Sequence, residues 1–112
     1  KSKYQYTIQD ALLFLKNKIG TKYDNEFIID NNSYYCSELI YEAFLKDSIF
    51  LLKPMTFLHP NNTDTIDTWK KHYKKIGKPI PQNQMGINPG IMSLSEKIDI
   101  VHTYGFPDGM KK

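Results

Sequence analysis

The sequence contains a single cysteine, Cys36, within the stretch Tyr-Tyr-Cys-Ser-Glu-Leu at residues 34–39. A loop rich in Asp, Asn and Ser precedes it and an apolar pattern with helical spacing follows, so we expect Cys36 in the first turn of a helix. The unpaired N–H groups and the positive dipole end of such a turn stabilise an anion. A thiol attacks a carbonyl as the thiolate, so this position favours a cysteine nucleophile whose own backbone N–H serves an oxyanion.

An inert, buried thiol is the alternative interpretation of Cys36, because free cysteines are often buried. One cysteine forms no internal disulfide and cannot anchor a structural zinc site, and no two of the three histidines have metal-ligand spacing. The sequence therefore predicts no metal centre. A thiol hydrolase would need no metal and no organic cofactor.

A thiol hydrolase also needs an imidazole base, and the three histidines of the chain all follow Cys36. His102, in Asp-Ile-Val-His, is a weak candidate for that base. His59, in a loop, and His72, on the helix face away from Trp69, are expected at the surface. A segment upstream of this chain is the other possible source of the histidine.

Three helices are expected, at residues 7–20, 36–46 and 63–77, because apolar residues recur there at intervals of three and four. Thr7 and Asp10 have capping-box spacing in the first, with Thr63 the candidate N-cap of the third. The positions expected to face the core are Ile8, Ala11, Leu12, Leu15 and Ile19 in the first helix, Leu39, Ile40, Ala43 and Phe44 in the second, and Ile66, Trp69, Tyr73 and Ile76 in the third.

The strands are expected to be few. Residues 49–57 predict a brief strand that Pro54 halts, and residues 97–105 predict a closing strand. Residues 78–90 are expected to be irregular, followed by a short capped turn between Ser93 and Glu96. This order of elements is typical of a single α+β domain over residues 1–112. The sheet looks too small for three helices, which indicates that part of the fold lies outside the chain.

Composition narrows the classes of function. Of the 112 residues, 40% are hydrophobic and 24% charged, and the net charge of +3 comes from lysine alone, without arginine. Sites that bind nucleic acid rely heavily on arginine, so we expect no nucleic-acid partner. No apolar run approaches the roughly 20 residues of a membrane span. The sequence leaves the compartment open, and an exported protein that lost its signal upstream is compatible with it.

Two segments, Gly-Thr-Lys-Tyr-Asp at residues 20–24 and Tyr-Cys-Ser-Glu-Leu at residues 35–39, together resemble permuted papain-like cysteine hydrolases of the NlpC-type superfamily, in the YiiX/YebB-like branch. Residues 88–105 are similar to the closing turn and final strand of that branch. The resemblance implies a circularly permuted papain-like α+β fold, with a small antiparallel sheet packed on helices and this chain as its C-terminal portion.

The resemblance also implies roles for individual residues. Cys36 is the nucleophile, and Tyr23 supplies an oxyanion-binding or substrate-positioning hydroxyl. Glu38 either orients a substrate amine or caps the helix, whereas Ser37 and Asp24 are expected to be local hydrogen-bonding supports. In this branch the base histidine precedes the cysteine, so an upstream segment of the same polypeptide is expected to provide it.

The expected function is thiol-dependent acyl transfer on a peptide or another amide or ester substrate, with cell-wall peptides as one possibility. An inactive binding module that keeps the cleft between Tyr23, Tyr35 and the Cys36 helix is the alternative. A third reading, docking of the lysine-rich surface on an acidic polymer, predicts salt-sensitive binding that does not involve Cys36.

Overall fold

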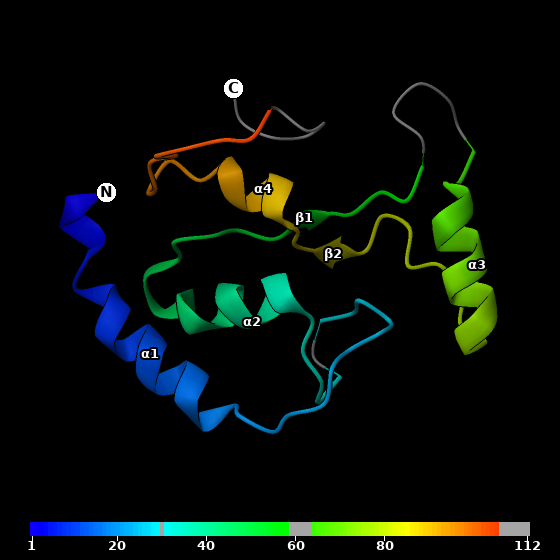
Figure 1. The fold of residues 1–112 in the computed structure, drawn as a ribbon, viewed down its shortest axis with the longest axis horizontal. Coiled ribbons are helices and arrows are strands. Elements are labelled where there is room, and N and C mark those ends of the chain that lie inside the picture. Colours follow the sequence, from blue (N-terminus) through cyan, green and yellow to red (C-terminus); the bar gives the residue numbers. More distant parts are fainter. Residues whose placement is uncertain (30, 59–63, 106–112) are drawn as a thin grey trace.

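The computed structural model describes residues 1–29, 31–58 and 64–105. Within these residues the fold is α+β, as predicted from the sequence. Its helices are α1 (Thr7–Asn17), α2 (Cys36–Ala43), α3 (Asp67–Ile76) and α4 (Pro89–Ser93), its strands are β1 (Lys53–Pro54) and β2 (Met85–Gly86), and its 3-10 turns are Ser2–Tyr4 and Leu45–Asp47. Helix α1 packs against α2, and α3 lies at the opposite end of the molecule from α1 (Figure 1).

Helix α2 begins at Cys36, as predicted. Tyr35 is its N-cap in an extended conformation, and the carboxylate of Glu38 accepts a hydrogen bond of 3.3 Å from the Tyr35 N–H. A glutamate in this third helical position satisfies a donor that the helix itself leaves unpaired. The first turn is therefore fixed by local hydrogen bonds, with Cys36 as its first residue.

The predicted capping box of the first helix is wrong. The 3-10 turn Ser2–Tyr4 leads into α1, and Tyr6 is already helical, so Thr7 is inside the helix instead of at its N-cap. The Thr7 hydroxyl donates to the Tyr4 carbonyl at 2.7 Å. Helix α3 begins at Asp67, and its predicted N-cap, Thr63, lies outside the described residues.

The two strands form an antiparallel pair in which Lys53 faces Gly86 and Pro54 faces Met85. Strand β1 thus includes Pro54, which the sequence analysis took as its end, and β2 lies in the segment expected to be irregular. The pairing continues past Pro54, because the Met55 N–H donates to the Gln84 carbonyl at 2.9 Å. Proline lacks only its own N–H, which an edge strand tolerates.

Two further predictions near the C-terminal end are wrong. The short helix α4 precedes the expected Ser93–Glu96 turn, because the Asn88 side chain caps it by accepting from the Ile91 N–H at 2.8 Å. The expected strand at residues 97–105 is absent from the described part of the chain. Alternation of apolar residues makes a strand only where a neighbour completes the ladder, and in the described chain no neighbouring strand pairs with this segment.

The core is built around Tyr35, Ile49, Phe50 and Ile87, all buried. The apolar stripe predicted for the first helix reaches this interior only in part. Ala11 is 2% exposed where α1 meets α2, but Leu12 is 51% exposed. In the described chain, three apolar side chains of α1 are exposed: Ile8, Leu12 and Leu13.

The buried phenols predict an alkaline limit of stability. Burial raises the pKa of Tyr35 to about 12 and that of Tyr73 to about 12. The phenols of the unfolded chain ionise near pH 10, and above that pH their ionisation favours the unfolded state. The stability associated with the buried, neutral phenols is therefore complete below about pH 10 and is lost as the pH rises towards about 12. Each residue contributes at most about 2 to 3 kcal/mol.

Urea unfolding at neutral and alkaline pH tests this limit. The Tyr35 hydroxyl accepts from the Ile87 N–H at 3.1 Å, so Y35F leaves a buried donor unpaired and should cost about 1 to 3 kcal/mol at pH 7. Y35F should also lose stability less steeply than the wild type in the alkaline range. An equal slope for both proteins would contradict the assignment.

Candidate active site

Cys36 is exposed at the N-terminus of α2, which excludes the alternative of a sealed, buried thiol. Its side chain borders a pocket of about 260 Å³. The residues that line this pocket come from the end of α1, the loop after it and the first turns of α2: Lys18, Thr21, Lys22, Tyr23, Tyr34, Tyr35, Cys36 and Leu39. An accessible sulfur beside a pocket is the minimum that a nucleophile requires.

The backbone brings Tyr23 alongside Cys36. Tyr23 and Tyr34 form a parallel β-bridge, in which the Asp24 N–H donates to the Tyr34 carbonyl at 3.0 Å and the Tyr34 N–H donates to the Lys22 carbonyl at 3.2 Å. Because Tyr34 lies two residues before Cys36, this bridge places the two sequence motifs side by side.

Tyr23 and Cys36 line the same pocket. Partial burial raises the pKa of Tyr23 above its usual value, and the neighbouring Cys36 side chain acts in the same direction. The backbone of Cys36 acts on this pKa in the opposite direction. Tyr23 therefore remains a protonated donor at neutral pH.

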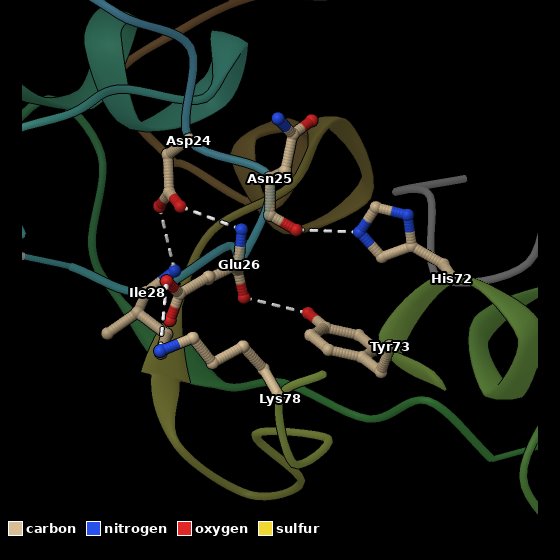
Figure 2. A network of polar contacts seen from close by, with 7 residues as sticks. All are labelled: Asp24, Asn25, Glu26, Ile28, His72, Tyr73 and Lys78. Carbon is tan, nitrogen blue, oxygen red and sulfur yellow. Dashed lines mark hydrogen bonds and ion pairs between the residues drawn. The ribbon is translucent and has the colours of Figure 1, made fainter. Parts of the chain in front are cut away.

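Asp24 supports the loop that follows Tyr23. Its carboxylate is 2% exposed and accepts from the Glu26 N–H at 2.8 Å and from the Ile28 N–H at 2.9 Å. Figure 2 shows both bonds inside the turn. Asp24 faces this backbone, so its contacts are those of a local support.

Helix α3 holds the same loop from the other side. His72 donates from Nε2 to the Asn25 carbonyl at 2.6 Å, and the Tyr73 hydroxyl donates to the Glu26 carbonyl at 2.8 Å (Figure 2). The expectation that His72 faces away from Trp69 is wrong, since the centroids of the two rings are 5.9 Å apart. The lysines of α3 occupy the outer face, and His72 lies at the border with the aromatic side.

Glu38 and Ser37 lie on the inner side of α2. The Glu38 side chain is 1% exposed and accepts from the Tyr35 N–H. Ser37 is 4% exposed, with its Oγ 3.9 Å from the Cys36 sulfur. The helix thus presents Cys36 to solvent and buries the two polar residues that follow it.

No histidine of the described chain lines the Cys36 pocket. His72 is bonded to Asn25, and His102 is exposed with its ring 4.7 Å from that of Tyr104. His59 lies outside the described residues. Within residues 1–29, 31–58 and 64–105, no three His, Cys, Asp or Glu side chains gather in a way that would hold a metal ion.

The roles of Phe27 and of His72 and Tyr73 in α3 were not predicted from the sequence. Phe27 has a positive φ of 56°, and no residue type or dipeptide at this position indicates it. A weak signal was available for the turn itself, because an Asp-Asn pair such as Asp24–Asn25 is typical of side-chain-capped turns.

No helix among the described residues combines the length and the apolar character needed to cross a membrane. Comparison with known proteins gives one result. A model of a protein family, described as "permuted papain-like amidase enzyme, YaeF/YiiX, C92 family", matches residues 1–102. Neither a search of curated proteins nor a search of solved structures finds a match. The matched range contains both motifs and the whole pocket around Cys36, and the chain therefore belongs to this family of permuted papain-like amidases.

Proposed function

We propose that residues 1–112 are the C-terminal portion of a thiol-dependent amidase or peptidase domain, with Cys36 as its nucleophile. The observation that carries this proposal is the arrangement at the first turn of α2. There an exposed sulfur borders a pocket that the protonated Tyr23 side chain also lines.

The chemistry follows from this geometry. The Cys36 sulfur attacks the carbonyl carbon of an amide, a C–S bond forms, and the carbonyl π electrons move to the oxygen. Collapse of this tetrahedral intermediate breaks the C–N bond and releases the amine, which takes a proton from an imidazolium. Water then attacks the thioester, releasing the acid and the thiol.

The oxyanion of this intermediate has two donors available. Tyr23 and Cys36 line the same pocket, and Cys36 is the first residue of α2. A substrate carbonyl oxygen bound there would receive hydrogen bonds from the Cys36 N–H and from the Tyr23 hydroxyl. Each donor aimed at a developing oxyanion is commonly worth about 3 kcal/mol. Glu38 would act through the backbone here, since its carboxylate holds the N-cap of α2.

An upstream segment of the same polypeptide, in this proposal, supplies the base histidine. Two observations support it: neither described histidine lines the pocket, and the apolar side of α1 is open for a further element to cover. A reading frame upstream of Lys1 that encodes a histidine followed by a β-branched strand pattern is the expected finding. A frame without such a histidine would contradict this part of the proposal.

The substrates that we propose are amides in peptides, with cell-wall peptides the first to assay. A second candidate function, an inactive binding module, is favoured by the lack of an imidazole at the pocket in the described chain. The two candidates differ in the reactivity of the thiol, because only catalysis needs a thiolate near neutral pH.

Alkylation by iodoacetamide across pH separates them. Intact-mass measurements should show Cys36 modified rapidly well below about pH 8, as expected of a thiolate stabilised at a helix start. C36S is the control that corrects for modification elsewhere. Modification that becomes appreciable only above about pH 8 would favour the binding module.

A further inference from the structure

Phe27 adopts a backbone conformation that is rare for a bulky side chain. Its φ of 56° lies in the left-handed region, where an aromatic residue is disfavoured unless its surroundings hold it. The peptide groups on both sides of Phe27 are held: Asp24 accepts from the Glu26 and Ile28 N–H groups, and Tyr73 donates to the Glu26 carbonyl. Figure 2 shows these bonds converging on the turn.

The Phe27 ring contacts aromatic residues of the candidate site and of α3. Its centroid is 6.4 Å from that of Tyr23 and 5.5 Å from that of Tyr35, the N-cap of α2. It is also 5.4 Å from Trp69 and 5.6 Å from His72, both in α3. The contacts with Tyr23 and Trp69 are edge-to-face, at 85° and 83°, a favoured geometry for aromatic pairs.

Tyr23 needs such a support, because its side chain is exposed. The residue is 55% exposed, and within the described chain its backbone is held through the bridge to Tyr34. A phenol on such a segment rotates unless a neighbour packs against its ring. Positioning of a catalytic hydroxyl is sensitive to displacements of about 1 Å.

We propose that Phe27 is a positioning residue, whose clamped left-handed backbone inserts the ring between Tyr23 and α3 and so holds the Tyr23 hydroxyl against Cys36. This inference rests on the proposed function for its catalytic meaning. Helix α3, through His72 and Tyr73, is then the anchor of the turn that carries Phe27.

Hydrolysis kinetics of F27L test the proposal against F44L. Phe44 has the same intermediate burial, packs on Phe50 at 6.0 Å and lies at the far end of α2. With a chromogenic peptide amide and the complete polypeptide, F27L should lower kcat about tenfold with little change in KM, as for a misplaced catalytic group. F44L should lower the melting temperature similarly but leave kcat unchanged.

A double-mutant cycle with Y23F separates positioning from general destabilisation. If Phe27 acts through the Tyr23 hydroxyl, F27L should lower kcat less than about twofold once that hydroxyl is gone. Effects of F27L and Y23F that simply multiply would overturn the proposal. So would an F27L protein whose kcat matches that of F44L.

A second readout needs no hydrolysis. The rate of Cys36 alkylation by iodoacetamide at neutral pH should fall by the same factor, about threefold, in Y23F, in F27L and in the double variant, because Y23F deletes the Tyr23 hydroxyl and F27L displaces it from the sulfur. F44L should alkylate at the wild-type rate. Hydrolysis by C36A would overturn the proposed function. Equal alkylation rates of F27L and F44L would overturn only the role of Phe27.

Discussion

C36A is expected to lower the kcat/KM for amide hydrolysis by at least about a thousandfold, because the bond that carries the acyl group can no longer form. The side chain of Cys36 is exposed at the first position of α2, and alanine is the best helix former. The variant should therefore unfold at the same urea concentration as the wild type.

Steady-state kinetics on a peptide amide, with the complete polypeptide, measure this loss, and C36S serves as the matched variant that keeps a weak nucleophile. Serine lacks the acidity of the thiol, so C36S should also be inactive. Turnover by C36A above the uncatalysed rate would show that another group performs the chemistry.

Y23F is expected to give the second largest effect, a loss of about a hundredfold in kcat, because it removes one of the two donors that we propose for the oxyanion. The phenylalanine keeps the ring that packs on Phe27, and KM should change little. Since the pKa of Tyr23 is raised above its usual value, the hydroxyl stays protonated in both neutral and mildly alkaline solution. The ratio of wild-type to Y23F activity should therefore be constant below about pH 9.

Y6F is the matched control for this substitution. The Tyr6 hydroxyl donates to Asp47 at 3.0 Å on an exposed surface away from the pocket. Removing it changes the same atom of the same residue type, and kcat should stay at the wild-type value. A Y23F protein as active as Y6F would exclude the hydroxyl from the chemistry.

The parts of the site that the sequence predicted are those set by local hydrogen bonding. The start of α2 at Cys36 follows from a polar loop, an apolar pattern and a glutamate at the third helical position, and all of these lie within a few residues. The Tyr23 motif was identifiable through its resemblance to a family pattern. The position of Tyr23 beside Cys36 depends on the backbone bridge between Tyr23 and Tyr34, which the sequence did not indicate.

The parts that were not predictable depend on distant partners. Strand β2 exists because Met85 and Gly86 meet β1, although their own sequence favours an irregular segment. Residues 97–105 have strand-like alternation but no strand forms there in the described chain. Phe27 takes a left-handed conformation because Asp24 and Tyr73 hold its neighbours, and Tyr73 is remote in sequence. Propensity and periodicity contain none of this information.

The acyl-enzyme itself tests the central claim most directly. The protein is mixed with an activated ester, p-nitrophenyl acetate, near neutral pH, quenched in acid and examined by intact mass and peptide mapping. The account predicts one acetyl group per chain, on the sulfur of Cys36, released by hydroxylamine and absent from C36A. Acetylation confined to lysines, or equal in the wild type and C36A, would contradict the assignment of Cys36 as the nucleophile.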